Sequence, residues 1–249
     1  MSEIRILMLD IETAPHLAAV WGLWQQNVAT NQIIKPGYTL CWAAKWYGEK
    51  EVMFSSILDG HRNMVQKAHK LLTECDAVCH YNGTKFDIPT LNKEFLLLHL
   101  KPPSPYKQVD LLKTARSRFR LASNKLDYVA SQLGLGSKVA HKGFDLWLEC
   151  MAKNREAWRT MRRYNKHDVV LLERVYERLL PWIKGHPNLS VYDGSRVCPN
   201  CGSEKNQARG YAVMQAKRYR RFQCRACGSW HRSQTAEKSE KGETNFPVN

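Results

Sequence analysis

The chain has 249 residues and a formal net charge of +15, with 43% hydrophobic and 24% charged residues. This hydrophobic fraction excludes an intrinsically disordered chain, and the length is enough for one substantial core with a small appendage. The excess of positive charge favours a polyanionic partner such as nucleic acid.

The first predicted element is a buried strand. Residues 4–9 form an apolar run rich in β-forming residues, and Asp10 and Glu12 follow it directly. Because side chains alternate across a strand, both carboxylates should emerge on the same face.

Strands and helices continue along the chain. Residues 13–37 include two tryptophans and show no clean periodicity. Residues 38–47 and 51–54 predict a hairpin. Apolar spacing then predicts a helix with its inner face at residues 64–72, a strand at 77–80, a helix at 87–100, a strand at 107–112 and a mainly helical region at 126–183. This order predicts an α/β fold in which helices pack against a mixed sheet.

A second acidic feature lies in the predicted C-terminal helical region, where we expect a long amphipathic helix to begin near Tyr164. Tyr164 and Asp168 are four residues apart and therefore share one helix face. The same stripe continues through apolar positions, so Asp168 should lie on the buried side, where an unpaired carboxylate would cost several kcal/mol. The sequence therefore predicts a cation beside Asp168. The apolar positions of the stripe are Leu171, Leu172, Val175 and Leu179.

A third acidic candidate, Asp87, lies between a predicted strand end and a helix start, where ligands converge above an α/β sheet. Four carboxylates close together would repel one another unless divalent cations lay between them, and oxygen ligands suit Mg²⁺ or Mn²⁺. Two such ions about 3.5–4 Å apart can clamp a phosphodiester. Tyr164 is a poor base, with an ordinary phenol pKa near 10, so we assign it to holding and orienting the attacking water.

Each of these residues also has a plainer interpretation. Asp87 could be a helix N-cap, Asp10 and Glu12 could be solvated acids at a strand-to-loop junction, and Tyr164 could be ordinary core packing. Asp168 is the hardest to explain in this way, because its helix stripe is otherwise apolar.

Taken together, these motifs resemble the DnaQ-like, or DEDD, 3′–5′ exonuclease superfamily, and the resemblance covers residues 1–183. The spacing of Tyr164 and Asp168 resembles the tyrosine-type branch, since the histidine-type branch would place His where this chain has Arg163. The resemblance implies a ribonuclease H-like fold and release of nucleoside monophosphates from a 3′ end. It also implies that Asn82 lies near the substrate and that the metal ligands are Asp10, Glu12, Asp87 and Asp168.

Four of the eight cysteines form two tight pairs, Cys198 with Cys201 and Cys224 with Cys227. Two CxxC pairs predict one structural Zn²⁺ held by four thiolates, and the alternative is two disulfides. No apolar run is long enough to span a membrane, and the start of the chain lacks a secretory signal pattern. We therefore expect a reducing, cytoplasmic setting and no membrane partner.

The cysteine module resembles the zinc ribbons found on nucleic-acid enzymes. Residues 194–232 contain nine Lys or Arg and one acidic residue, and residues 217–222 predict a strand with basic and aromatic side chains. Basic groups can meet phosphates while aromatic rings stack on bases; the alternative is a solvated ribbon whose charges only keep it soluble. The candidate nucleic-acid contacts are Lys217, Arg218, Tyr219, Arg220, Arg221 and Trp230.

These features predict an exonuclease domain at residues 1–185, a linker at 186–193, a zinc ribbon at 194–232 and a polar, disordered tail at 233–249. The leading interpretation is a metal-dependent 3′–5′ exonuclease acting on single-stranded or frayed ends, with DNA favoured over RNA. A structure-selective endonuclease and a catalytically inactive nucleic-acid-binding adaptor are the alternatives. Because the sequence contains no polymerase domain, proofreading would require a polymerase or other replication or repair partner.

Overall fold

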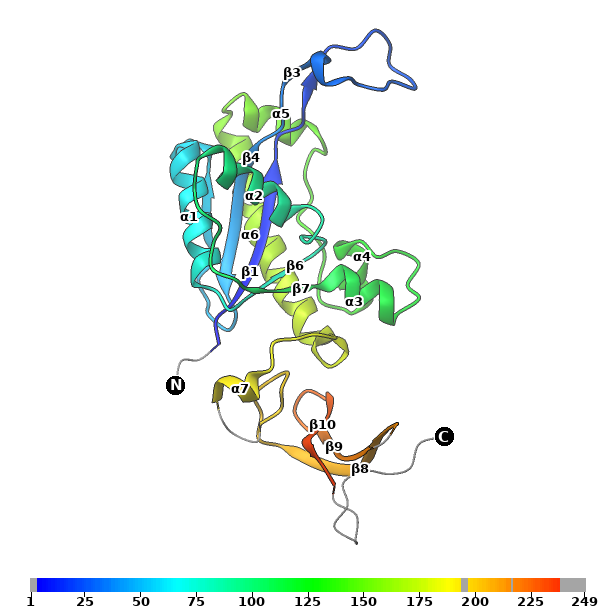
Figure 1. Cartoon of the computed structure of the whole chain (residues 1–249). Helices are drawn as coiled ribbons and strands as arrows, with labels where there is room; N and C mark the ends of the chain where they lie inside the picture. The colour runs from blue at the N-terminus through cyan, green and yellow to red at the C-terminus, as the bar shows by residue number, and fades with distance from the viewer. Residues whose placement is uncertain (1–3, 194–196, 216, 238–249) are drawn as a thin grey trace. The chain divides into compact units, whose positions relative to one another are not determined.

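A computed structural model describes residues 4–193, 197–215 and 217–237 (Figure 1). The chain divides into two compact units. The larger comprises Arg5–Tyr176, and the smaller contains Ile4 and the described residues from Glu177 onward. None of the described helices has the length and apolar composition of a membrane span.

The larger unit is built on a five-stranded mixed sheet in the order β5-β4-β1-β6-β7. β1 pairs antiparallel with β4, which pairs antiparallel with β5, while β1, β6 and β7 run parallel to one another. This confirms the predicted α/β class and mixed sheet. The strands are β1 (Ile6–Thr13), β4 (Thr39–Trp46), β5 (Met53–Ser56), β6 (Ala77–His80) and β7 (Lys107–Asp110).

β1 lies at the centre of the sheet and extends four residues beyond its predicted end at Leu9. Asp10 and Glu12 are therefore ladder residues, opposite Ala43 and Cys41 of β4. Because the strand continues through them, the alternation that predicted a common face applies directly to these two carboxylates.

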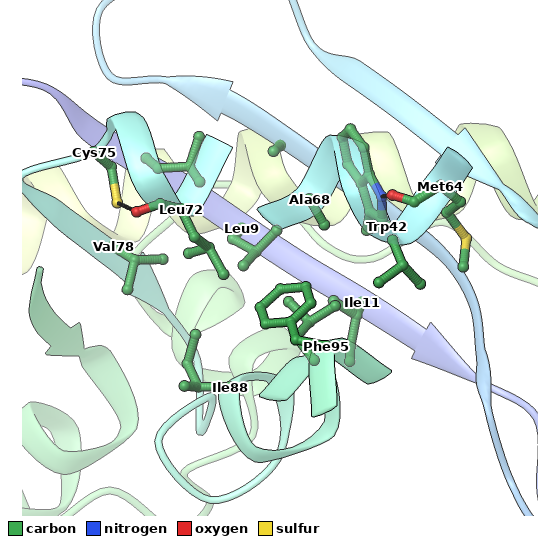
Figure 2. Packing of buried hydrophobic residues seen from close by; sticks show 14 of the residues in the cluster. Leu9, Ile11, Trp42, Met64, Ala68, Leu72, Cys75, Val78, Ile88 and Phe95 are labelled. Atoms are coloured by element: carbon green, nitrogen blue, oxygen red, sulfur yellow. Dashed lines mark hydrogen bonds between the residues drawn. The ribbon is translucent and has the colours of Figure 1, made fainter. Parts of the chain in front are cut away.

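One face of the sheet is covered by helices α1 (His61–Glu74) and α2 (Asp87–Leu97). Figure 2 shows Leu9 and Trp42 from the strands packing with Phe95 and the apolar side of α1. The indole nitrogen of Trp42 donates to the Met64 carbonyl at 2.9 Å, which satisfies a polar group inside this core. The helix predicted at residues 87–100 ends at Leu97.

The opposite face is covered by α5 (Asp145–Met151) and α6 (Arg155–Leu179), whose side chains Trp158 and Met161 pack against Cys41 of β4. The prediction that this helix begins near Tyr164 is wrong. It begins at Arg155, because the side chain of Asn154 accepts hydrogen bonds from the backbone nitrogens of residues 156 and 157 and caps the first turn. Tyr164 and Asp168 therefore lie in the interior of α6.

The strand predicted at residues 107–112 ends at Asp110, whose carboxylate accepts from the Leu112 nitrogen at 3.1 Å and starts the next helix. The remaining elements of this unit are the helices α3 (Leu111–Arg118) and α4 (Leu126–Gln132), the 3₁₀ turns η1 (Thr30–Gln32) and η2 (Ile57–Asp59), and the small strands β2 (Leu17–Ala18) and β3 (Ile33–Lys35).

The smaller unit contains an antiparallel three-stranded sheet in the order β10-β9-β8. β9 (Lys217–Cys224) confirms the strand predicted at 217–222. β10 (Trp230–Ala236) continues four residues into the predicted tail, because its last residue pairs with Tyr219, and the tail residues 238–249 lie outside the described part of the chain. The other elements are β8 (Asn206–Met214), η3 (Leu180–Trp182) and α7 (Leu189–Asp193).

The predicted linker at residues 186–193 has local order. α7 lies within it, and the Leu189 nitrogen donates to the Pro199 carbonyl at 2.9 Å. The Asn200 amide nitrogen donates to the Leu180 carbonyl at 2.9 Å, so the first cysteine pair is tied to both η3 and α7. The domain limits proposed from sequence stay predictions.

Candidate functional site

Three of the four predicted carboxylates meet on one face of the sheet. Odd-numbered residues of β1 pack against α1 and α2, so Asp10 and Glu12 point to the face covered by α6. Asp168 arrives from α6 one turn after Tyr164. One carboxylate oxygen from each of Asp10, Glu12 and Asp168 lies within 4.8 Å of the other two.

Asp87 joins this group from the start of α2 but lies outside the set of three. Its carboxylate accepts a hydrogen bond at 3.1 Å from the backbone nitrogen of Ile11, the residue between Asp10 and Glu12. Phe86, not Asp87, is the N-cap of α2, so the plainer interpretation of Asp87 as an N-cap is wrong. Asp87 is almost completely buried.

Burial and mutual repulsion raise the pKa values of these acids. Burial is the largest cause of the raised pKa of Asp10, and the charges of Glu12, Asp87 and Asp168 raise this pKa further. Burial also raises the pKa of Glu12 to about 7, although Lys138 opposes the change. The pKa of Asp87 rises to about 7 for the same reason, against the hydrogen bond from Ile11. Without a bound metal ion the cluster therefore retains protons near neutral pH, even though Lys138 is present.

A lysine that the sequence did not indicate lies inside the cluster. The Lys138 ammonium group is 2.5 Å from Oδ2 of Asp168 and donates to the Tyr164 hydroxyl at 3.0 Å. Burial lowers the pKa of Lys138, but Asp168, Tyr164 and Asp10 raise it by more, so the side chain stays charged. We predicted a cation beside Asp168, and this ammonium group is one that the chain itself supplies.

The loop between α4 and α5 holds Lys138 in place. The backbone nitrogen of Lys138 donates to Oδ1 of Asp127 at 2.7 Å. The carbonyl of the preceding residue, Ser137, contacts Nε2 of His167 at 2.9 Å. Neither contact follows from apolar periodicity, because the loop has none. This is why the lysine was missed.

Two further polar groups fix the carboxylates. The Asn165 amide donates to Oδ2 of Asp10 at 2.6 Å, and the Trp147 indole donates to Oε2 of Glu12 at 3.2 Å. A signal for Asn165 was available, because it interrupts the otherwise apolar helix stripe of Val169, Leu172 and Tyr176. A buried amide in such a stripe requires a partner.

The ring of Tyr164 packs against two other aromatic rings. It meets His141 edge-on at 4.8 Å and Trp147 at 6.1 Å between ring centroids. Burial and the nearby charges of Asp168 and Glu12 raise the pKa of the phenol, with Lys138 opposing them. The hydroxyl therefore stays protonated at neutral pH and can hold or orient a water but not act as a base.

A cavity of about 640 Å³ has Asp10 and Lys138 among its lining residues. This volume is in the usual range for small-ligand sites. Asn82 also lines the cavity, and its backbone is in the left-handed conformation with φ of 69°. The backbone nitrogen of Asn82 donates to the carboxylate of Asp110 at 3.0 Å, which holds this conformation. Further lining residues include Arg116, Asn124 and Lys125. The site therefore joins an acidic cluster to a cavity that carries three cationic side chains.

The carboxylate cluster fits divalent cations. Among the described residues, Oδ1 of Asp168 is buried and has no hydrogen-bond partner, so one strong oxygen donor remains available. The other donors are carboxylates whose mutual repulsion a cation would relieve. Oxygen ligands of this kind suit Mg²⁺ or Mn²⁺ better than softer metals.

The four cysteines of the smaller unit form a second candidate metal centre. Sγ atoms of Cys198, Cys201, Cys224 and Cys227 all lie within 4.8 Å of one another. The pairs Cys198–Cys227 and Cys201–Cys224 are each 3.7 Å apart, too far for a disulfide at about 2.05 Å. Tetrahedral Zn–S bonds of about 2.3 Å place sulfurs at roughly this separation. The cluster is compatible with a structural zinc site.

The predicted nucleic-acid contacts of the ribbon form cation–π pairs on both faces of its sheet. Arg218 and Arg220 lie over Tyr211 at 4.3 and 5.0 Å. On the other face Arg221 lies over Trp230 at 5.1 Å and Arg232 over Tyr219 at 3.9 Å. Lys217 is exposed at the start of β9. Tyr211 and Arg232 complete these pairs and were not among the predicted contacts.

Comparison with known proteins connects this geometry to a family. A family model described as the RNase H superfamily matches residues 7–180. No curated protein sequence matches the chain. The structure of the family B DNA polymerase from the hyperthermophilic archaeon Pyrobaculum calidifontis is similar over 72% of this chain, with 18% sequence identity and a TM-score of 0.52. The match spans 25% of the polymerase, and at this identity it shows the fold alone.

The raised carboxylate pKa values predict how pH affects stability without added Mg²⁺ or Mn²⁺. Folded pKa values near 7 exceed the ordinary 4.5 of Glu12 and 3.8 of Asp87, so stability should be lost as pH rises toward 7. Each pKa unit corresponds to about 1.4 kcal/mol, and 1 kcal/mol shifts the melting temperature of a chain of this size by roughly 2–4 °C. Thermal unfolding between pH 4.5 and 8 measures the loss.

Substitution variants isolate this effect from other titrating groups. Glu12→Gln and Asp87→Asn should melt above the wild type at pH 8 and lose that advantage near pH 4.5. Mn²⁺ should raise the melting temperature of the wild type at pH 8 more than that of either variant. If melting temperature depended on pH in the same way for all three proteins, with and without Mn²⁺, the raised pKa values of Glu12 and Asp87 and their role in metal binding would be contradicted.

Proposed function

The chain belongs to the RNase H superfamily, and on that premise we propose that it is a metal-dependent 3′–5′ exonuclease of single-stranded or frayed nucleic acid. Membership of this superfamily supports a nuclease. The observation that carries the proposal is the cluster of Asp10, Glu12 and Asp168, whose oxygens lie within 4.8 Å of one another beside a cation-lined cavity. We favour DNA over RNA as the substrate.

The specific assignment is the tyrosine-type branch of the DnaQ-like exonucleases. Its support is the order of the acidic motifs along the chain and the position of Tyr164 one helical turn before Asp168. The hydrogen bond from the Ile11 nitrogen holds Asp87 against the strand that carries Asp10 and Glu12. All four acids and the tyrosine are present, which argues against an inactive adaptor.

The proposed mechanism assigns one role to each group. Asp10, Glu12 and Asp168, with Asp87 beside them, would hold two Mg²⁺ or Mn²⁺ ions, which when bound supply charge to the phosphodiester and acidify the attacking water. Tyr164, protonated at neutral pH, orients that water through its hydroxyl. Asn165 and Trp147 keep the carboxylates of Asp10 and Glu12 in position.

Lys138 supplies positive charge where negative charge develops in the reaction. In the described structure it contacts both Asp168 and the Tyr164 hydroxyl, and it lines the cavity. A fixed cation at this position can stabilise the phosphoryl oxygens of the transition state, and it costs no reorganisation because the loop already holds it. Arg116 and Lys125 line the same cavity and can meet the phosphates of the terminal nucleotides.

The proposed activity predicts metal-dependent nucleotide release. Wild-type protein with Mg²⁺ or Mn²⁺ should release nucleoside monophosphates from a 3′-labelled oligonucleotide, and Asp168→Ala should reduce the rate by at least about 10³-fold. Glu49→Gln, an exposed acid in the turn after β4, is the matched control and should retain activity. Matched DNA and RNA strands test the proposed preference.

A covalently closed single-stranded circle decides between the two modes of cleavage. An exonuclease leaves the circle intact, whereas linearisation would favour the alternative of a structure-selective endonuclease. Equal inertness of wild type and Asp168→Ala, with both metals and both nucleic acids, would contradict the enzymatic proposal.

A separate prediction concerns Lys138. Lys138→Met should lower kcat by about 10²-fold, the cost of losing one preorganised charge. It should also lower the Mn²⁺ concentration needed for half-maximal activity, because the ammonium group no longer competes for Oδ2 of Asp168. Steady-state rates across a Mn²⁺ titration measure both effects.

Lys142→Met is the control, because Lys142 lies in the same loop and is exposed. It should leave both quantities unchanged. A loss of Mn²⁺ affinity in Lys138→Met would instead indicate that the lysine only supports the fold.

We propose that the ribbon is a second contact surface for the nucleic-acid strand. Its support is the set of arginines stacked on aromatic rings, which holds guanidinium groups ready for phosphates and leaves Trp230 half-exposed for base contacts. One Zn²⁺ held by the four cysteines would keep the sheet folded.

Substitution of Arg218, Arg220 and Arg221 by Ala should weaken binding of a long oligonucleotide and reduce the slope of affinity against salt concentration. Hydrolysis of a very short substrate should stay unchanged. Zinc content should remain at one ion per chain, which verifies that the ribbon is folded. An unchanged salt slope in a variant with full zinc would show that the arginines only solvate the ribbon.

A further inference from the structure

The chain between β1 and β4 forms an apolar arm with no place in the mechanism above. This arm, residues 13–37, leaves β1 one residue after Glu12 and projects beyond the sheet, drawn in blue at the top of Figure 1. It returns to the sheet at Thr39, the first residue of β4. The arm therefore grows directly from the strand that carries two of the catalytic carboxylates.

The stem of the arm is ordered by its own hydrogen bonds. β2 and β3 pair antiparallel, and the Ala19 nitrogen donates to the Gln32 carbonyl at 3.0 Å. The side-chain amide of Gln32 donates to the backbone carbonyl of Ala19 at 3.0 Å. At the base, the Ala14 nitrogen donates to the Tyr38 carbonyl at 2.8 Å, and Lys93 of α2 donates to the Gly37 carbonyl at 2.8 Å. The stem can therefore hold its tip at a defined distance from the site.

The tip presents large apolar side chains to solvent. Trp21 is 99% exposed, Leu23 87% and Trp24 85%. Exposed aromatic and aliphatic groups gathered on one segment mark a binding surface, because leaving them in water is unfavourable. Further exposed apolar residues of the arm are Leu17, Val20, Val28 and Ile34.

The charge of the arm is compatible with a polyanion. Residues 13–37 contain no Asp or Glu, and Lys35 lies over the ring of Tyr38 at the base, 4.8 Å from its centroid. An aromatic tip without acidic residues, attached to a site built for phosphodiesters, suits nucleic-acid bases, whose faces stack on Trp whatever the sequence. The nine residues from Glu12 to Trp21 can reach at most about 30 Å when fully extended, which corresponds to roughly nine stacked nucleotides at 3.4 Å each.

We propose that the arm is a further nucleic-acid contact, separate from the ribbon, in which Trp21 and Trp24 stack on bases of the single strand several nucleotides away from the bond that is cut. This inference rests on the proposed function, because it assumes that the strand is seated in the carboxylate site. It predicts a length threshold: strands that reach the arm are held by it, and shorter ones are not.

Binding to labelled single strands tests the arm without cleavage. In an Asp168→Asn background with Mg²⁺, fluorescence anisotropy compares strands of about 20 and about three nucleotides, longer and shorter than the reach of the arm. The double variant Trp21→Ala/Trp24→Ala should weaken binding of the long strand by about tenfold or more and leave the short strand unchanged. Leu96→Ala/Leu97→Ala, at two exposed apolar positions on α2, should bind both strands normally.

Two further double variants separate base stacking from general apolar contact. Trp21→Leu/Trp24→Leu keeps apolar area but removes the aromatic faces, and it should bind as weakly as the Ala pair. Trp21→Phe/Trp24→Phe should retain most of the affinity. Wild-type affinity in either the Ala or the Leu pair would overturn the proposal, as would a change of oligomeric state in the Ala pair without a change in strand affinity, which would make the arm a protein-binding surface.

Activity on the short substrate distinguishes failure of this inference from failure of the proposed function. With Asp168 restored, the Trp21→Ala/Trp24→Ala protein should hydrolyse the short strand at the wild-type rate. If wild type and variant are both active and bind long strands equally, only the arm proposal fails. If the wild type is inactive on every substrate, the proposed function fails.

Discussion

Crowding of negative charge at the end of the central strand is the constraint on which the larger unit depends. Asp10, Glu12 and Asp168 bring oxygens within 4.8 Å of one another, with Asp87 close by; Asp87 and Asp168 are buried, and Asp10 and Glu12 are half-buried. Repulsion and burial both disfavour such a group unless positive charge enters it. Lys138 provides part of that charge, and the unpartnered oxygen of Asp168 leaves room for a metal ion to provide the rest.

The two faces of the sheet differ in a way that makes this crowding of negative charge possible. The odd-numbered residues of β1 pack with α1 and α2 into an apolar core that fixes the strand. The even-numbered residues can then carry carboxylates toward α6, which brings Tyr164, Asn165 and Asp168 to the same place. The burial of one face therefore provides the rigidity that holds charged groups together on the other, and the loop between α4 and α5 supplies Lys138, the cation that contacts Asp168.

The sequence allowed those parts of the site to be predicted that follow from the period of one element. The two-residue period of β1 predicted the common face of Asp10 and Glu12, and the four-residue spacing in α6 predicted that of Tyr164 and Asp168. Lys138 could not be predicted, because its position depends on tertiary contacts of an aperiodic loop. The start of α6 was missed because the cap that sets it is a single Asn154 hydrogen-bonding residue outside the apolar pattern.

Counting the ions at the carboxylates tests the central claim most directly. Mn²⁺ added to the zinc-loaded protein and followed by electron paramagnetic resonance should show two bound ions with the magnetic coupling of a pair about 3.5–4 Å apart. Asp10→Asn should remove that coupling, because this side chain lies within reach of both Glu12 and Asp168. A spectrum without coupled ions in the wild type, or an unchanged one in the variant, would contradict the account of this cluster as a two-metal site.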